Sequence, residues 1–143
     1  MIARDTIAFF GHELITATHK STFEITKEDF LGPKGNCIIG IKSNKACNDL
    51  NPILRKTLKS DYVKVTLTLV VGGYLFKVLA SGSPELTLED NNSVVVRKSS
   101  FVCPRTLAVK ATSSARDLPR TMINMLKNRY STGTMIIEAK VPR

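Results

Sequence analysis

The only two histidines of this 143-residue chain, His12 and His19, are the residues whose usual pKa best suits proton transfer near neutral pH. His19 is followed directly by Lys20, and Glu24 lies a few residues further on. Together with Asp90, His19, Lys20 and Glu24 are the candidate acid–base groups. The same side chains are also typical of a solvated turn, and both interpretations stay open.

Basic side chains accumulate in the last third of the chain. Residues 1–92 hold eleven Lys and Arg against ten Asp and Glu, whereas residues 93–143 hold ten against two. Such an asymmetry favours an anionic partner, which is a nucleic acid, a phosphorylated ligand or an acidic protein. An inert basic surface is the alternative.

Side chains suited to phosphate gather around VVVRKSS (94–100). Arginine offers a planar fork of donors, and serine adds a hydroxyl. A second group of basic residues is expected on one face of the second helix. The predicted anion-binding residues are His19, Lys20, Arg97, Lys98, Ser99, Arg105, Arg116, Arg120 and Lys127.

These residues predict a non-enzymatic protein that binds RNA or another nucleic acid through its backbone phosphates. The alternative is an enzyme or sensor for a small phosphorylated metabolite, with Arg97 and Arg105 holding the phosphate. A third interpretation is a protein-interaction module with free sheet edges, which would allow an edge-strand dimer. The patterns GxxxxGK[ST], GxGxxG, CxxC and HxxxH do not occur, so no cofactor or metal is expected.

An internal repeat organises the chain. Residues 82–101 match residues 11–30 at an offset of 71, and residues 106–128 match residues 38–60 at an offset of 68. One gap therefore aligns nearly the whole chain, which predicts a gene duplication. We expect a single domain of two repeats, about 1–72 and about 73–143. Positions paired by these offsets are called equivalent below.

Each repeat predicts the same series of elements. Its members are a leading strand (5–11 and 74–80), a hairpin (13–18 with 22–26, and 85–89 with 93–97), an apolar strand, a short helix (50–60 and 118–129) and a closing strand. The first hairpin would place His19 and Lys20 at its tip. The expected fold class is α+β, a mostly-β domain of about ten strands whose two halves are related by a pseudo-two-fold axis, as a barrel or a sandwich.

Residues that match between the repeats are expected to serve the fold. Phe30 and Phe101 are predicted to fill the core, and Asp49 and Asp117 to cap a helix or the turn before it. The hairpin tips differ, because His19-Lys20 is equivalent to Asp90-Asn91. If the two tips met, they would form a site.

Composition predicts a cytoplasmic protein. The three cysteines are odd in number and far apart, which is typical of a reducing compartment. The sequence MIARDTIAFF lacks the features of a signal peptide, and the apolar run VTLTLVVGGYLF (65–76) predicts a hairpin and not a membrane span.

The stretches GHELITATHKSTFEITKEDF, GNCIIGIKSNKA, SVVVRKSSF and RTLAVKA resemble an archaeal family known as domain of unknown function 371. The resemblance covers essentially the whole chain. Typical members read Gly-His-Pro near the start of each copy, where this chain has Gly11-His12-Glu13 and Gly82-Ser83-Pro84. The resemblance implies an archaeal, cytoplasmic setting and no particular activity.

Overall fold

The computed structural model describes residues 2–32 and 34–142. The order strand, strand, strand, 3₁₀-helix, α-helix, strand occurs twice along these residues. The first series is β1 (Ile2–Phe10), β2 (Thr22–Thr26), β3 (Ile38–Gly40), η1 (Cys47–Asp49), α1 (Pro52–Leu58) and β4 (Lys64–Val71). The second is β5 (Tyr74–Ser81), β6 (Ser93–Arg97), β7 (Thr106–Ala108), η2 (Ala115–Asp117), α2 (Arg120–Leu126) and β8 (Thr132–Lys140).

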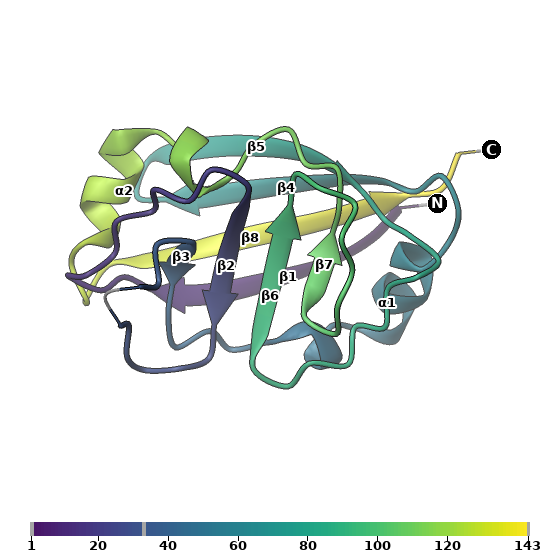
Figure 1. Ribbon diagram of the computed structural model, residues 1–143, viewed down its shortest axis with the longest axis horizontal. Helices are drawn as coiled ribbons and strands as arrows, with labels where there is room; N and C mark the ends of the chain where they lie inside the picture. The colour runs from purple at the N-terminus through teal and green to yellow at the C-terminus, as the bar shows by residue number, and fades with distance from the viewer. Residues whose placement is uncertain (1, 33, 143) are drawn as a thin grey trace.

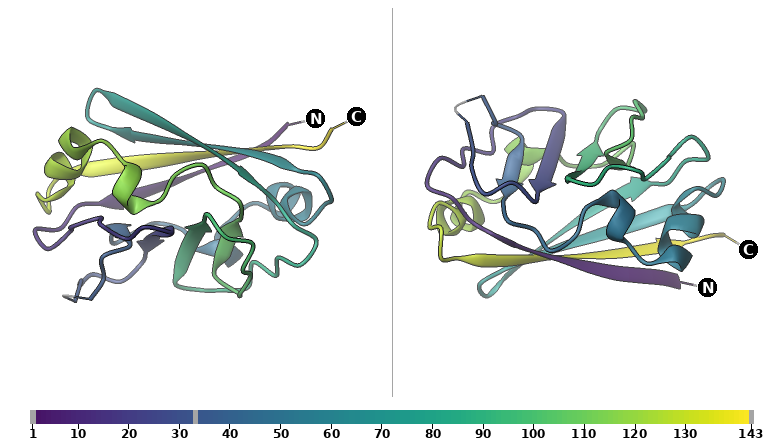
Figure 2. Two further views of the ribbon diagram at one scale, coloured as in Figure 1. Left: turned by 45° about the horizontal axis from the view of Figure 1, so that its top comes forward. Right: turned by 90° about the horizontal axis from the view of Figure 1, so that it is seen from below.

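The strands form two layers (Figures 1 and 2). One is an antiparallel four-stranded sheet of long strands in the order β1-β8-β4-β5. The other is a four-stranded sheet of short strands in the order β3-β2-β6-β7, in which β2 and β6 pair antiparallel at the centre. Its edge strands β3 and β7 run parallel to their neighbours.

The mostly-β character and the single short α-helix in each half are confirmed, but a closed barrel is wrong. Within residues 2–32 and 34–142, the β-bridges between the two sheets are isolated ones, Phe10 to Ile41 and Ser81 to Val109. Closure would need a continuous hydrogen-bond ladder around the molecule. The edge strands β3 and β7 are three residues long and cannot supply one.

The core lies between the two sheets, with a helix at each end of the molecule (Figure 1). Alternate residues of β4, such as Leu67 and Leu69, are fully buried against the inner face of the short-strand sheet, where Phe23 and Val96 lie. Residues of both halves belong to this one hydrophobic cluster.

One equivalent pair of core sites is packed in two different ways. Phe9 of β1 lies beside Gly133 of β8 and Gly40 of β3, where an added Cβ would overlap the Phe9 ring. The equivalents of Phe9 and Gly133 are Ala80 and Val65, which also face each other across two strands. A large residue beside a glycine in one half thus replaces an alanine beside a valine in the other.

The predicted hairpins at 13–18 and 85–89 are wrong. Ala17 and Leu88 have φ of 49° and 52°, outside the β region, and neither segment forms a strand. The alternating burial that suggested strands is real, since Ile15 and Ala17 are buried and their neighbours are exposed. The hydrogen bonds differ, because the Ala17 and Leu88 carbonyls accept from Arg120 and Arg55 side chains in place of a partner strand.

The matched aspartates act as predicted, whereas the matched phenylalanines do not. Asp49 Oδ2 accepts the Ala46 N–H at 2.8 Å and Asp117 Oδ2 accepts the Ser114 N–H at 2.9 Å, so each caps the 3₁₀ turn before a helix. Phe30 and Phe101 are 65% and 59% exposed, so their placement in the core is wrong. The loops after β2 and β6 carry these rings away from the inner face of the sheet.

Loops cover part of each edge of the long-strand sheet. On β1, Ala8 N–H donates to Asn44 Oδ1 at 2.9 Å and its carbonyl accepts the Asn44 N–H at 3.1 Å. On β5, Leu79 makes the same pair of bonds with Thr112, at 3.1 and 2.8 Å. These contacts occupy backbone groups that an edge-strand dimer would use.

Candidate anion-binding surface

His19 caps a turn that leads into β2. Its Nδ1 accepts the backbone N–H groups of Ser21 at 3.1 Å and Thr22 at 3.2 Å, which requires the tautomer protonated on Nε2. The equivalent Asp90 Oδ2 accepts from Asn92 at 3.1 Å and Ser93 at 2.7 Å before β6. The imidazole thus takes the structural place of a carboxylate, and it does so without the negative charge.

The two turns lie at opposite ends of the β2–β6 pair. The register joins Thr22 to Arg97 at one end and Thr26 to Ser93 at the other. Five residues of strand separate the ends by about 15 Å. The structure therefore does not bring the candidate acid–base set together, because His19 and Lys20 lie at one end, Asp90 lies at the other, and Glu24 lies between them.

Four segments lie side by side at the end of the β2–β6 pair that carries His19. We call this border the basic rim (residues 19–21, 97–99, 110–112 and 116–117). Backbone hydrogen bonds join them, from Lys98 N–H to Ser21 O at 2.9 Å, from Lys110 N–H to Ser99 O at 2.9 Å, and from Arg116 N–H to His19 O at 3.0 Å. Five basic residues, Lys20, Arg97, Lys98, Lys110 and Arg116, stand there against one acidic residue, Asp117.

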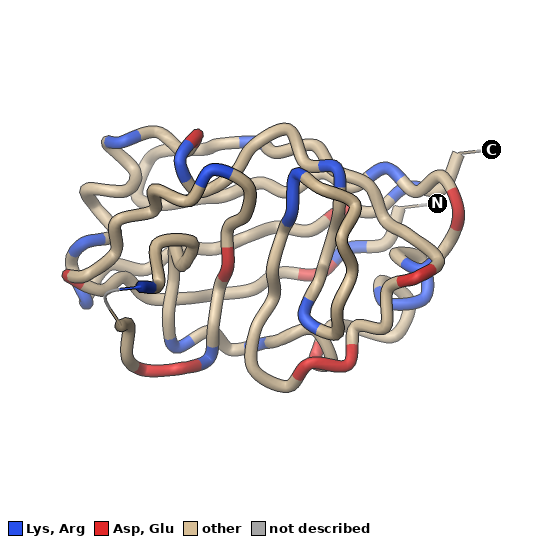
Figure 3. Tube along the Cα trace, in the orientation of Figure 1, with Lys and Arg blue, Asp and Glu red and all other residues tan. Residues whose placement is uncertain are grey.

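The equivalent border at the other end, the opposite rim, has a different charge (residues 90–92, 26–28, 42–44 and 48–49). Equivalent backbone bonds hold it together, from Lys27 to Asn92 at 2.8 Å, from Lys42 to Glu28 at 2.8 Å and from Asn48 to Asp90 at 3.1 Å. It holds two basic and three acidic residues. Figure 3 shows blue segments at the upper ends of β2 and β6 and red segments in the loops along the lower border.

One basic side chain of the rim is paired. Lys98 Nζ lies 2.8 Å from Asp117 Oδ2, and this hydrogen bond, with that from Ser114, lowers the pKa of Asp117 to about 2. Lys27 and Asp49 form the equivalent pair, at 2.6 Å, on the opposite rim. None of the ion pairs within residues 2–32 and 34–142 involves Lys20, Lys110 or Arg116. These three charges remain available to a ligand.

Arg97 starts on the basic rim but lies over the outer face of the short-strand sheet. Its Nε donates to Thr106 Oγ1 at 3.0 Å, its Nη2 lies 3.3 Å from Cys103 Sγ, and its guanidinium stacks on the Phe101 ring at 4.9 Å. Burial acts to raise the pKa of Cys103, but bonds from Thr106, the Arg105 backbone and Arg97 lower it below the usual value.

Arg105 belongs to a second cluster on the same outer face. Its Nη1 lies 3.4 Å from Glu24 Oε1, and Glu24 is buried. Cys37 Sγ lies 3.6 Å from the same oxygen, and burial, followed by the charge of Glu24, raises the pKa of Cys37 to about 11. Because Arg105 neutralises a buried carboxylate, its charge is less available to an external anion.

The predicted row of basic residues on one face of the second helix is wrong. Arg116 lies on η2, and α2 begins only at Arg120. Arg120 donates to several backbone carbonyls, among them Ala17 O at 3.1 Å and Ala115 O at 2.9 Å. Lys127 follows the last turn of α2. The three side chains therefore do not form one surface.

One predicted residue, Ser99, adds little to the rim, and one residue, Lys110, was missed. Ser99 contributes its carbonyl to Lys110, and its hydroxyl accepts the Phe101 N–H at 3.3 Å. Lys110 was missed, although its equivalence to Lys42 places both at the same point after a short strand. Only the partner segments show that one of these lysines faces basic neighbours and the other faces acidic ones.

No group of three or more His, Cys, Asp or Glu residues suited to a metal ion occurs within residues 2–32 and 34–142. Over the same residues, no helix is long and apolar enough to span a membrane.

Comparison with known proteins gives consistent results. Residues 7–140 match a family model described as "Domain of unknown function (DUF371)". An uncharacterized protein of Methanocaldococcus jannaschii is 39% identical over 117 residues, which cover 82% of this chain and 86% of that protein. The chain therefore belongs to the DUF371 family.

Proposed function

We propose that this protein binds nucleic acid, most of all RNA, through backbone phosphates at the basic rim. One observation carries the proposal. Two borders built from equivalent residues and equivalent backbone bonds have opposite charge balance. Lys20, Lys110 and Arg116 concentrate positive charge where the fold itself does not require it. Phosphate contacts of this kind supply most of the sequence-independent affinity for nucleic acid.

The fold offers a matched pair of variants as a test. Lys110 and Lys42 are equivalent, exposed, and have φ of 54° and 51°. Asparagine tolerates this left-handed region, so Lys110→Asn and Lys42→Asn remove one charge each with little backbone strain. Only Lys110 lies on the basic rim.

Fluorescence anisotropy with labelled RNA across a salt series measures the effect. Contacts from Lys20, Lys110 and Arg116 predict a log–log salt slope of about −2 to −3. Lys110→Asn should weaken binding about four- to eightfold near 0.15 M salt and reduce the slope by about 0.7–0.9. Lys42→Asn should change neither value. No binding at low salt, or equal losses for the two variants, would contradict the proposal.

The alternative function, an enzyme or sensor for a small phosphorylated metabolite, has less support. It needs His19, Glu24 and Asp90 within reach of one ligand, and the β2–β6 register separates His19 from Asp90. Arg97 and Arg105 are held by Thr106 and Glu24 on the outer face. A thermal-shift screen of phosphorylated metabolites would detect such a ligand.

We also propose that the chain arose by internal duplication and works in the cytoplasm. Equivalent residues repeat their contacts. Gly11 N–H donates to Ser131 O at 2.9 Å, and Gly82 N–H donates to Val63 O at 3.1 Å. The φ values of Ala17 and Leu88 are likewise both positive. A reducing compartment agrees with all three cysteines being free.

A further inference from the structure

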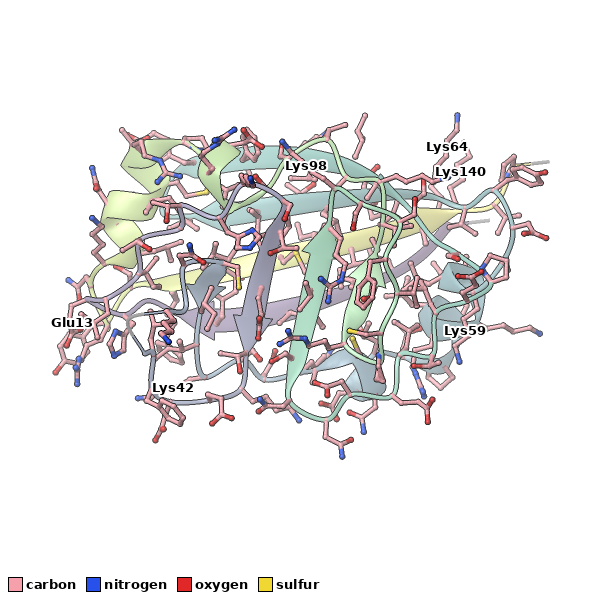
Figure 4. All side chains as sticks on the ribbon, viewed as in Figure 1. Glu13, Lys42, Lys59, Lys64, Lys98 and Lys140 are labelled. Atoms are coloured by element: carbon pink, nitrogen blue, oxygen red, sulfur yellow. The ribbon has the colours of Figure 1, made fainter. Side chains whose placement is uncertain are left out.

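A groove continues from the basic rim toward the start of β4. A cavity of about 760 Å³ lies between the segments 61–64 and 81–85, with Ser100 and Lys110 on its wall. A smaller hollow of about 380 Å³ shares Lys64, Ser81 and Lys110 with it. Lys110 belongs both to the basic rim and to this groove. In Figure 4, Lys98, Lys64 and Lys140 all lie along the upper border, whereas Lys42 lies at the lower one.

The region equivalent to the groove, between residues 10–14 and residues 129–132, is bridged by an ion pair. Arg129 donates to Glu13, at 3.1 Å for the Nε contact, and the hydrogen bond from Arg129 lowers the pKa of Glu13 to about 2. The equivalents of these residues in the groove are Asp61 and Pro84, which cannot form such a pair. One side of the molecule is therefore bridged where the other is open.

The groove combines positive charge, hydroxyl groups and one exposed aromatic ring. Lys64 and Lys110 take part in no ion pair among the described residues, and Ser81 and Ser100 lie beside them. Tyr62 lines the wall with 86% of its surface exposed. The acidic residues Asp61 and Glu85 also line the groove, so phosphates are expected on the side of the two lysines.

We propose that this groove holds a single-stranded segment of nucleic acid that continues from the basic rim, with phosphates against Lys64 and Lys110 and a base stacked on Tyr62. This inference rests on the proposed function and adds the strandedness of the ligand. A basic groove that follows the backbone, with an aromatic ring for the bases, is the usual design of sequence-tolerant single-strand binding. The bases of a duplex are stacked on one another and cannot reach the ring.

Tyrosine fluorescence gives a direct readout, because the chain has three tyrosines and no tryptophan. Base stacking on Tyr62 should quench the emission when single-stranded RNA is added, and duplex RNA should leave it nearly unchanged. Tyr62→Phe should lose most of the quenching and keep its affinity. The control is Tyr130→Phe, because Tyr130 is the equivalent residue and is 84% exposed. This control should behave like the unaltered protein.

Affinity measured by anisotropy completes the test. Tyr62→Ala should bind single-stranded RNA roughly 5- to 100-fold more weakly, with duplex binding unaffected, because a stacked base is lost. Lys64→Thr introduces the residue found at the equivalent position 132, and it should also weaken single-strand binding. Tyr130→Ala should change neither affinity.

Failure of this inference can be told apart from failure of the proposed function. One outcome is that RNA binds and Lys110→Asn weakens binding, while Tyr62→Ala and Lys64→Thr keep the affinity of the unaltered protein and Tyr62→Phe keeps its fluorescence quenching. In that case the groove is not the binding path, and the basic rim alone is the site. If single strands and duplexes bind equally in every variant, the inference is also overturned. If no nucleic acid binds at low salt, both proposals are wrong.

Discussion

Replacing Arg120 should separate stability from binding. The pattern of basic residues assigns Arg120 to an anion site, whereas its hydrogen bonds give it a structural role, which we call the clamp, because they join two segments of the backbone. Its Nη1 donates to Thr16 O at 3.2 Å and its Nη2 donates to Ala17 O at 3.1 Å, so it ties the segment before β2 to the η2 turn. Because that segment pairs with no strand among the described residues, the Thr16 and Ala17 carbonyls accept hydrogen bonds from the Arg120 side chain in place of a neighbouring strand.

The size of the effect follows from the number of bonds. The guanidinium has five N–H donors and reaches the carbonyls of Thr16, Ala17, Ala115, Arg116 and Leu118. About three well-formed bonds at the lower end of the usual range, because Arg120 is partly exposed to water, amount to about 2–3 kcal/mol. For a chain of this length, Arg120→Met should lower Tm by about 6–12 °C.

Urea denaturation and RNA anisotropy together form the assay. Arg120→Met should lose stability but keep its RNA affinity within about twofold at temperatures where it is folded, whereas Arg116→Met should keep its stability within about 0.5 kcal/mol and lose affinity. Arg120→Lys preserves the charge and removes the fork, so it should be destabilised almost as much. An Arg120→Met variant as stable as the unaltered protein would refute the clamp.

Two further predictions concern the core and acid stability. Phe9→Ala should lower the free energy of unfolding, measured by urea denaturation, by about 3–5 kcal/mol. Adding Gly133→Val should restore at least about 1 kcal/mol, because the valine fills the cavity as Val65 does in the other half. A double variant that is less stable than Phe9→Ala would contradict this. The pKa of Asp117 is lowered from 3.8 to about 2, so its contribution to stability is fully present above pH 3.8 and is lost as the pH falls toward about 2. Circular-dichroism melts should show this decline, and Asp117→Asn should flatten it; identical profiles would exclude the pairing with Lys98 as a source of stability.

Local patterns predict the helices and most strands of this fold because side-chain periodicity reports burial directly. The apolar residues of β4 alternate, and the Gly72-Gly73 pair turns the chain back into β5 with φ of 60° at Gly72. The hairpin prediction at 13–18 fails for a related reason. Burial there does alternate, but the hydrogen-bond partner is the side chain of Arg120, far away in the sequence, and no local pattern reveals it.

The candidate site is predictable only in part, since a sequence does not show which charges are already satisfied. The sequence leaves open whether the segments of His19 and Lys98 meet, and backbone hydrogen bonds place both on one border, whereas the Arg97 side chain lies on the outer face. Arg105 was predicted to bind the same anion, yet its guanidinium forms an ion pair with buried Glu24. The availability of a cation depends on tertiary neighbours, so composition overestimates the number of cations that can bind a ligand.

The antiparallel β2–β6 pair explains how charge spread along the chain becomes charge on one border. Each rim contains the turn before one central strand, β2 or β6, and the end of the other central strand. Because β2 and β6 belong to different halves, both halves contribute to each rim. The segments that follow that second strand join the same rim, so residues 97–117 supply most of the basic rim and residues 26–49 supply most of the opposite rim. Four of the basic residues after residue 92, namely Arg97, Lys98, Lys110 and Arg116, therefore belong to one border. The turn at His19 carries no carboxylate where the other half has Asp90, which adds to this asymmetry, because a carboxylate there would place a negative charge beside Lys20 and Arg116.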